Sequence, residues 1–184
     1  MVRTSRFALA ALGSVSLALA GGAFAKNPMV GGAAMYPTKN IVQNAVNSKD
    51  HTTLVAAVKA AGLVDTLSGM GPFTVFAPTN AAFAKLPVGT VDSLVMPDNK
   101  GTLTSILTYH VVPGRITASQ IAAMAAGHHG VATLKTVQGE NLTFRKNGSA
   151  WMVTDAKGGK ARITIANVMQ SNGVIHVVDS VLMP

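Results

Sequence analysis

Two histidines in apolar segments are the residues best placed to do chemistry. His110 follows Tyr109 and precedes two valines, and His176 lies within the run Val174–Val178. In an open cleft such an imidazole could act as a general base. In a protein core it would instead be neutral and hydrogen-bonded to the backbone, because an unpaired buried imidazole costs about 1–3 kcal/mol. The apolar flanks favour the second interpretation, so we expect both rings to be structural.

A second pair of histidines could bind a metal ion or haem. His128 and His129 follow Met124 in a glycine-flanked segment, and imidazole and thioether groups are both usable ligands. Adjacent side chains on an extended chain point in different directions, however, and no carboxylate lies at ligand spacing. The alternative is an exposed loop, and we expect no metal site.

Signatures of common enzymes are missing. The chain has 184 residues and no cysteine, which excludes a thiolate nucleophile, a thiolate metal site and a disulfide scaffold. Its seven acidic residues are scattered and form no pair of neighbouring carboxylates. The motifs of nucleophile elbows, phosphate-binding loops and zinc proteases are absent. We therefore predict a protein that is not an enzyme and carries no cofactor.

The first 25 residues have the pattern of a secretory signal peptide. Arg3 and Arg6 precede an apolar run from Phe7 to Ala20, and Ala23 and Ala25 suit a small-residue cleavage site. The run is shorter than the roughly 20 residues that span a bilayer, and no later stretch is long and apolar enough to do so. We expect cleavage near Ala25, no transmembrane segment, and a secreted or periplasmic product. An uncleaved anchor is the alternative.

The charge predicts a basic product. The formal net charge is +8, and removal of the two arginines in the signal leaves 13 basic and 7 acidic residues, or +6. The lysines are scattered, and only Arg145-Lys146 and residues 157–162 approach a cluster. A nucleic-acid surface would need denser charge interleaved with aromatic residues. We expect no nucleic-acid partner and a surface that leans toward anionic glycans or lipid headgroups.

Helical patterns dominate the chain from residue 40 to about residue 108. Residues 26–39 contain glycine and proline without a period and are expected to form a short mature N-terminal arm. We expect helices over residues 41–46, 53–61, 80–86, 90–95 and 100–108. One strand, over residues 73–77, interrupts them and ends at Pro78. Thr79 or Asn80 is expected to cap the helix that follows.

Strand patterns dominate the remainder. We expect a strand over residues 109–112, ended by Pro113-Gly114, and then a helix capped by Thr117 over residues 118–125. Further strands are expected at residues 140–145, 150–154, 162–165 and 174–178, with Asn-Gly turns before two of them. Helices gathered early and strands gathered late predict an α+β domain.

Three stretches together resemble the fasciclin-like domain family. They are Gly71–Phe83 (GPFTVFAPTNAAF), Tyr109–Val112 (YHVV) and Ser171–Asp179 (SNGVIHVVD). Each alone is a weak signal, but their order, spacing and residue detail are similar to this family over about residues 40–184. The resemblance implies a wedge-shaped β-sandwich of short strands with several helices packed around it, forming a single domain from residue 40 to residue 184.

The signature residues are expected to serve as scaffold. Phe73 and Val75 should point to one side of their strand and Phe76 to the other, so that both faces are buried. Asn172-Gly173 should form a turn that needs a positive φ. The residues expected to have structural roles are Phe73, Val75, Phe76, Pro78, Thr79, Asn80, Phe83, Asn172, Gly173 and His176.

The resemblance also implies a function. It implies an exported, non-enzymatic module for cell-surface or matrix adhesion, whose partner is a cell-envelope or matrix component, either protein or glycan. In animal relatives a Tyr-His stretch and an Asp-Ile pair are linked to integrin recognition. Tyr109-His110 matches the first, but Asn167-Val168 stands at the second and lacks the carboxylate. Tyr109, His110, Asn167 and Val168 are therefore interaction candidates for a generic adhesive surface.

A carrier of an apolar small molecule is the alternative function. Methionine is enriched, and we expect most of the methionines spread across the domain to fill the core, namely Met70, Met96, Met124, Met152, Met169 and Met183. They could instead line a groove for a flat or polyene ligand, and some bacterial and algal relatives are thought to bind carotenoids. Haem is a further, less favoured ligand. Trp151 could contribute to such a groove or to a glycan-stacking face, although packing is the simpler role.

Overall fold

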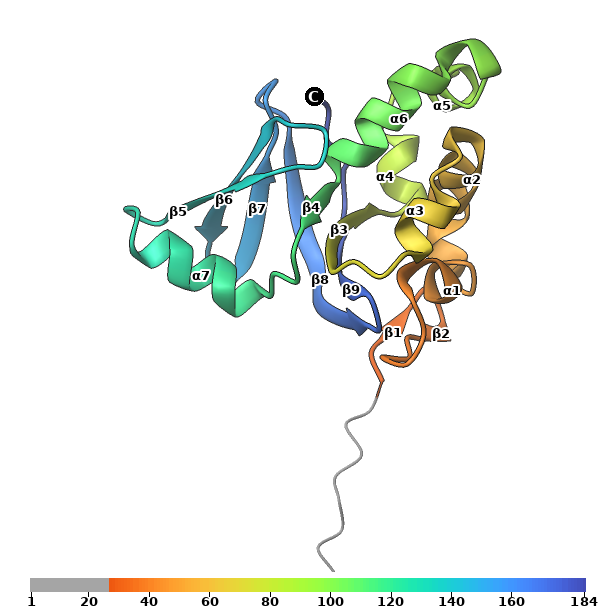
Figure 1. The fold of residues 1–184 in the computed structure, drawn as a ribbon. Coiled ribbons are helices and arrows are strands. Elements are labelled where there is room, and N and C mark those ends of the chain that lie inside the picture. The colour runs from red at the N-terminus through yellow and green to blue at the C-terminus, as the bar shows by residue number, and fades with distance from the viewer. Residues whose placement is uncertain (1–26) are drawn as a thin grey trace, which may run out of the picture.

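The computed structural model describes residues 27–184, so the expected signal peptide and its cleavage site lie outside the described residues. A two-stranded hairpin opens the described chain (Figure 1), formed by β1 (Met29–Val30) and β2 (Ala33–Ala34). Six helices and two 3₁₀ turns then surround one strand: α1 (Ile41–Ala45), η1 (Lys49–His51), α2 (Thr52–Ala61), α3 (Val64–Ser68), β3 (Phe73–Pro78), α4 (Asn80–Ala84), α5 (Thr90–Leu94), η2 (Pro97–Asn99) and α6 (Lys100–Tyr109).

Strands make up most of the second half, as the sequence predicts. Its elements are β4 (Val111–Pro113), α7 (Ala118–Ala126), β5 (Val131–Lys135), β6 (Asn141–Asn147), β7 (Ala150–Thr154), β8 (Lys160–Gln170) and β9 (Gly173–Val178). Within the described residues no helix has the length and apolarity needed to cross a bilayer.

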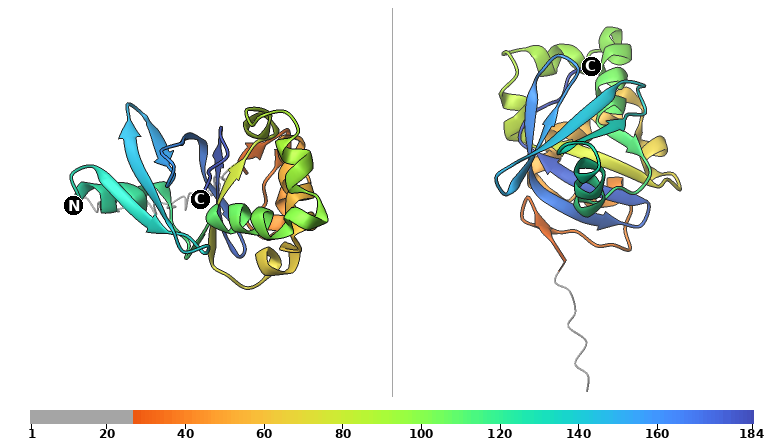
Figure 2. Two further views of the ribbon diagram at one scale, coloured as in Figure 1. Left: turned by 90° about the horizontal axis from the view of Figure 1, so that it is seen from above. Right: turned by 90° about the vertical axis from the view of Figure 1, so that its left-hand side faces the viewer.

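One seven-stranded sheet organises the fold. Its order is β4-β3-β9-β8-β7-β6-β5, and every pairing is antiparallel except that of β3 with β9. The long strand β8 changes register between Ile163 and Ile165 and again before Val168. These irregularities bend the strand, so that it belongs both to the β5–β8 layer and to the layer formed with β9, β3 and β4. Seen from above, the two layers diverge, with the C-terminus between them (Figure 2).

The sheet nearly closes on itself at its two edges. Beyond the end of β5, the Val137 N–H donates to the Val111 carbonyl of β4 at 2.8 Å. The result is a wedge-shaped, almost closed sandwich with helices around it, which confirms the predicted α+β fold class.

Two apolar clusters fill the molecule. The first, the helical cluster, lies between the helices and one face of β3 and β9, and it contains Val75, Ala77, Ile175 and Val177. The second, the inner cluster, fills the wedge between the two layers of the sheet, beneath α7, and it includes Phe76 from the opposite face of β3. The expectation that β3 buries both faces is thus confirmed.

The predicted strand over residues 109–112 is wrong in its first half. Tyr109 is the last residue of α6, and the His110 N–H still bonds to the Leu107 carbonyl at 3.1 Å. Leu103, Ile106 and Leu107 form a buried helical face, and Tyr109-His110 continues this helix because its packing outweighs local strand propensity. His110 therefore does not lie within a strand.

The expectation that most methionines fill the core is also wrong. Among the described residues, Met35 is buried, but Met70 is 97% exposed and Met29 and Met96 are also exposed. Met124, Met152, Met169 and Met183 are only partly buried. Branched aliphatic and aromatic side chains form most of both clusters.

The segment expected as an arm is tied to the body of the fold. Val30 and Met35 are buried against the helical cluster. Asn44 of α1 clamps Tyr36 by two bonds: its amide nitrogen donates to the Tyr36 carbonyl at 2.8 Å, and its amide oxygen accepts from the Tyr36 N–H at 3.1 Å. Residues 29–36 thus belong to the packed structure.

Candidate functional site

The three signature stretches meet side by side at one end of the seven-stranded sheet, in the order β4-β3-β9. Strand β3 lies between β4 and β9, with Thr74 opposite Val112 on one side and beside Val174 on the other. The resemblance therefore rests on residues that are far apart in the chain and adjacent in space, and the polar groups they place in the interior are the candidates for any chemistry.

Tyr109 is completely buried and links α6 to the opposite layer of the sheet. Its hydroxyl donates to the Asn141 carbonyl at 3.1 Å and accepts from the Ala156 N–H at 2.9 Å. Burial raises the pKa of this phenol above its ordinary value. Both hydrogen-bonding functions of the hydroxyl are used within the fold, so it is not available to a partner.

His110 anchors the C-terminal segment. Its Nδ1–H donates to the Ile106 carbonyl at 2.8 Å, and its Nε2 accepts from the Leu182 N–H at 3.0 Å. These two bonds require the neutral Nδ1–H tautomer, and burial lowers the pKa of the ring to about 4. Asp155 binds the next backbone amide, that of Met183, at 2.9 Å. The two side chains together fix the end of the chain inside the wedge.

His176 is held in the same manner. Its Nε2–H donates to the Ile116 carbonyl at 2.9 Å, and its Nδ1 accepts from the Asn167 N–H at 3.4 Å. The ring stacks on Phe76, with centroids 5.5 Å apart, and burial lowers its pKa. A buried, neutral imidazole with both nitrogens engaged is poorly suited to act as a general base.

The four interaction candidates do not form one surface. Tyr109, His110 and Val168 are 0%, 2% and 1% exposed, so the expectation that they face a partner is not met in this fold. Asn167 is exposed, but its φ of 60° places it in a bulge of β8, where its side-chain oxygen accepts from the Ala118 N–H at 2.8 Å. That bond caps the first turn of α7 from a distance, which explains an asparagine at this position.

Asn172 joins three elements. Its amide nitrogen donates to the Leu67 and Gly69 carbonyls, both at 2.8 Å, and its amide oxygen accepts from the Ile41 N–H at 3.0 Å. It therefore connects the start of α1, the end of α3 and the start of β9 through one buried side chain.

The expected positive φ at Asn172-Gly173 is wrong. Neither residue has a left-handed backbone, and the two turn residues are Ser171 and Asn172. Glycine is needed at position 173 for another reason, since a Cβ there would collide with the backbone carbonyl of Phe73. Strand β3 approaches too closely to admit any side chain.

Thr79 caps α4, accepting from the Ala82 N–H at 3.2 Å, and so brings Phe83 back onto the helical cluster. Asn80, the other cap candidate, has a different role: its oxygen accepts from the Thr53 N–H at 3.0 Å, and its nitrogen donates to the Lys49 carbonyl at 2.9 Å. It thus caps α2, whose own N-cap residue provides no side-chain bond.

His51 is a buried polar residue that sequence reasoning missed. Its Nδ1 lies 2.9 Å from the Ser48 hydroxyl, and its Nε2 is buried without a hydrogen-bond partner among the described residues. Burial lowers the pKa of His51. The nearby Ala77 carbonyl acts in the opposite direction, although it does not form a hydrogen bond with the ring. Ser48 and His51 are 2% and 3% exposed. This hydroxyl–imidazole pair is therefore closed to a substrate, and no sequence motif distinguishes it.

His128 and His129 lie in the exposed turn after α7. The His128 Nδ1–H donates to the Met124 carbonyl at 2.9 Å, and His129 has a φ of 52°. Residues 27–184 contain no cluster of three histidine, aspartate or glutamate side chains suited to hold a metal ion. This arrangement gives no support to the metal alternative.

Comparison with known proteins identifies the family to which the paired signature stretches belong. The Fasciclin domain family matches residues 49–184. Protein sll1483 of Synechocystis is 49% identical over 160 residues, covering 86% of this chain and 81% of that protein. Immunogenic protein MPB70 of Mycobacterium bovis is 35% identical over 202 residues, covering 100% of this chain and 96% of that protein.

Two further similarities cover only parts of longer proteins. The transforming growth factor-beta-induced protein ig-h3 of Sus scrofa is 37% identical over 131 residues, which are 71% of this chain and 17% of that protein. A solved FAS1 domain pair from the insect cell adhesion molecule Fasciclin I has the same fold, with a TM-score of 0.70 at 19% identity, and this chain spans 51% of it. With its matching sequence over most of its length and three signature stretches paired in one sheet, the chain belongs to the fasciclin domain family.

Proposed function

We propose that this chain is an exported, non-enzymatic adhesion or protein-interaction module that presents a fixed outer surface to a component of the cell envelope or the surrounding matrix. Membership in the fasciclin family supports the adhesive role, and relatives are named as a cell adhesion molecule and as the cell surface glycolipoprotein MPB83. The observation that carries the proposal is the internal use of the signature's polar groups. Tyr109, His110 and His176 bond to the backbone of distant segments, which leaves the outer surface to meet a partner.

Binding of the purified mature protein to isolated envelope and matrix fractions tests this proposal. The protein, expressed as the full chain and recovered after export, is labelled and titrated onto each fraction, with unlabelled protein as competitor. We expect saturable binding that the competitor displaces. Binding that is absent from every fraction, or that no competitor displaces, would overturn the adhesive role.

Export is tested separately by mass spectrometry of the N-terminus. The small residues Ala23 and Ala25 lead us to expect a mature chain that begins at Lys26. A full-length chain retained in the membrane fraction would contradict the proposed location.

A carrier of an apolar molecule is the second candidate, and an apolar crevice favours it. The crevice lies between α1, α2, α3 and α6 above β3, with the partly exposed Val42, Val55 and Val64 on its lining and Leu54 and Leu107 deeper inside. Its cavity volume is about 40 Å³, enough for only one or two water molecules. A carotenoid or haem would have to part the helices to enter.

An absorbance scan of protein purified from its native source tests the carrier. A bound polyene or haem gives a visible band, and Ala45→Trp, which fills the crevice wall on α1, should abolish uptake. A colourless preparation that also takes up no added carotenoid or haem would exclude this candidate.

A further inference from the structure

Basic side chains line up across the outer face of strands β5 to β8. Directly paired residues form one row of Val131, Arg145, Met152 and Arg162, and a second row of Thr133, Thr143, Thr154 and Lys160. A third row begins with Lys135 beside Asn141. Paired residues of antiparallel strands point to the same face of a sheet, so the register gathers these four cations on one side. We call this surface the basic sheet face.

The opposite side of the same strands is the core. Ala132, Phe144, Val153 and Ala161 form the alternating row and are all at most 1% exposed. Lys135, Arg145, Lys160 and Arg162 are exposed. The sheet thus has one buried face and one solvent-exposed face, and the basic sheet face is the exposed one. Its polar residues do not pack in the core.

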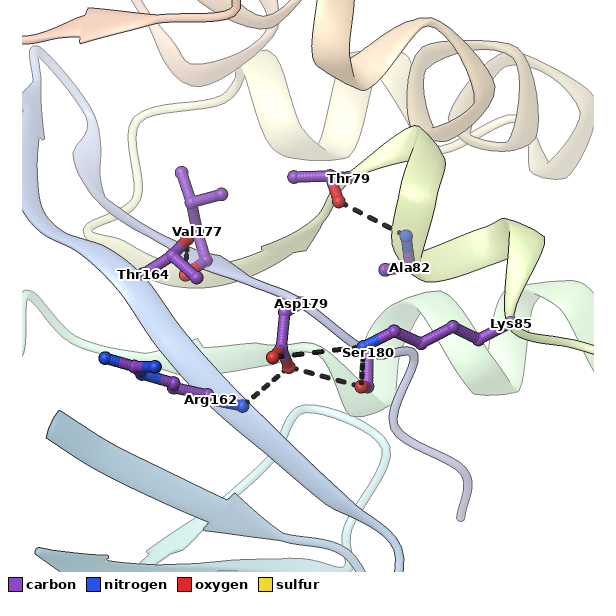
Figure 3. A network of polar contacts seen from close by, with 8 residues as sticks. All are labelled: Thr79, Ala82, Lys85, Arg162, Thr164, Val177, Asp179 and Ser180. Carbon is purple, nitrogen blue, oxygen red and sulfur yellow. Dashed lines mark hydrogen bonds and ion pairs between the residues drawn. The ribbon is translucent and has the colours of Figure 1, made fainter. Parts of the chain in front are cut away.

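Within residues 27–184, the ion pair that the structure shows joins Lys85 to Asp179. None of the four cations of the basic sheet face forms an ion pair with a residue in this range. Figure 3 shows that Asp179 lies beside the Arg162 backbone and binds its N–H at 2.8 Å, while the guanidinium points away. Asp155, in the turn between β7 and β8, is buried and accepts backbone N–H bonds. Glu140 lies in the turn before β6. The four strands themselves carry no acidic residue.

We propose that the basic sheet face binds an anionic polysaccharide whose charges are carboxylates or sulfates. This inference rests on the proposed adhesive function and names the chemical class of the partner. Neighbouring strands lie about 4.8 Å apart, so the backbones of Arg145 and Arg162 are roughly 10 Å apart and those of Lys160 and Arg162 roughly 7 Å apart. An extended polymer with repeating charges can engage several of these cations at once, and arginine can bind each anion through two parallel hydrogen bonds.

The side chains between the cations favour a sugar polymer over other polyanions. Thr133, Thr143 and Thr154 place hydroxyl groups in the middle row, where they can donate to and accept from sugar hydroxyls. A nucleic-acid surface would provide exposed aromatic rings for base stacking, but Trp151 points to the other side, where it packs against the inner cluster.

Membranes and acidic proteins fit the face less well. The large apolar side chains that are exposed, such as Met70 and Val88, lie outside these four strands. The apolar residues of the face, Val131 and Met152, are only partly exposed and lie within the sheet, so they are poorly placed to insert between lipids. A protein interface would be expected to have an apolar or aromatic centre. The middle row here consists of threonines and a lysine.

Titration with defined polymers tests the proposal on the exported full chain. Polygalacturonate and dextran sulfate are the anionic probes, and neutral dextran is the control. We expect the protein to bind at least one anionic probe with an affinity that falls as salt rises, and to show no binding to dextran. The double variant Arg145→Gln/Arg162→Gln should weaken binding about tenfold or more, because it removes two charge-assisted contacts.

Two matched variants separate a specific face from net charge. Lys49→Gln/Lys59→Gln removes the same charge from the exposed surface of η1 and α2, and we expect it to bind like the unchanged protein. Thr143→Val/Thr154→Val keeps the charge and the branched shape, and we expect it to weaken binding to the polysaccharide but not to poly-L-glutamate.

Several results would overturn the proposal. The first is that the protein binds neither anionic polysaccharide. The second is that Arg145→Gln/Arg162→Gln and Lys49→Gln/Lys59→Gln lose the same amount of affinity. The third is that the protein binds poly-L-glutamate, single-stranded DNA or phosphatidylglycerol vesicles more tightly than the polysaccharides. If the protein does not bind the anionic polysaccharides but still binds envelope or matrix fractions saturably, the adhesive function is retained with a different partner. If both fail, the proposed function is lost as well.

Discussion

At the scale of single residues, the signature histidines stabilise the fold as neutral rings. Each ring donates from one nitrogen and accepts at the other, and one of its two bonds joins a segment distant in sequence, at Leu182 for His110 and at Ile116 for His176. A second proton on either ring would put an N–H against another N–H in a site with little water. Burial accordingly lowers the pKa of His51, His110 and His176 alike.

This arrangement predicts a loss of stability in mild acid. The ordinary histidine pKa of 6.5 applies to the unfolded chain, while the folded His110 has a pKa of about 4. Between these values the unfolded state binds more protons, so the free energy of unfolding is highest above pH 6.5 and falls as the pH drops toward 4. His110 alone contributes a fall of about 3 kcal/mol, and the other two histidines add to it.

Urea unfolding from pH 7.5 to 4.5, with the histidine ring signals followed by NMR, measures this effect. A free energy of unfolding that stays flat over this range, or a folded-state His110 that titrates near 6.5, would contradict the structural role of the ring.

At the scale of elements, close contact between β3 and β9 determines which residues are allowed. The parallel pair aligns Phe73 with Gly173, and a Cβ at position 173 would meet the Phe73 carbonyl group. We predict that Gly173→Ala lowers the free energy of unfolding by about 1–3 kcal/mol, because the strands must separate to accept a methyl group.

Gly101→Ala is the matched control for this substitution. Gly101 lies in α6 with open space around its missing side chain, so alanine should leave stability unchanged or raise it by about 0.5–1 kcal/mol. Equal destabilisation by the two alanines, or a neutral Gly173→Ala, would show that the close approach of the strands is not what selects glycine.

The short helix α4 depends on the packing of Phe83. Thr79 caps this helix, and Phe83 is 7% exposed within the helical cluster. We predict that Phe83→Ala costs about 3–5 kcal/mol of stability, as expected for an aromatic side chain removed from a core. Val88→Ala, at a fully exposed position just before α5, should change stability by less than about 0.5 kcal/mol. Chemical denaturation of both variants measures these changes. A Phe83→Ala variant as stable as Val88→Ala would show that α4 does not contribute to the core.

Sequence patterns predicted most elements because helix caps and strand breakers act locally. Gly62 ends α2 with a left-handed backbone, and Thr117 caps α7 together with Gln120. The predictions failed where tertiary contacts decide. Tyr109-His110 reads locally as a strand but completes a buried helical face, and the glycine at position 173 is required by β3, which lies about 100 residues earlier in the chain.

The candidate site was less predictable than the fold for the same reason. The structural roles of His110 and His176 followed from their apolar flanks, but the segments they bond to, at Leu182 and Ile116, have no motif. The basic sheet face had a weak signal, since Arg145, Lys160 and Arg162 occupy alternate positions of strands. Only the register of β5 to β8 reveals that these positions lie side by side.

At the scale of the whole molecule, buried polar contacts fix both ends of the described chain. Asn44 holds Tyr36 near the start, while His110 and Asp155 hold Leu182 and Met183 at the end. The two apolar clusters on either side of β3 and β9 complete a body in which the signature residues are interior. The proposed adhesive function therefore assigns partner binding to the outer surface, and membership in the fasciclin family supports an adhesion or interaction role.

The most direct measurement of this claim is surface attachment by cells that lack the gene. Attachment and aggregation are compared among the parent strain, a deletion strain, and the deletion strain complemented with the unchanged gene. The account predicts that deletion reduces attachment and that complementation restores it. Unchanged attachment after deletion, with a purified protein that binds no envelope or matrix component, would contradict it.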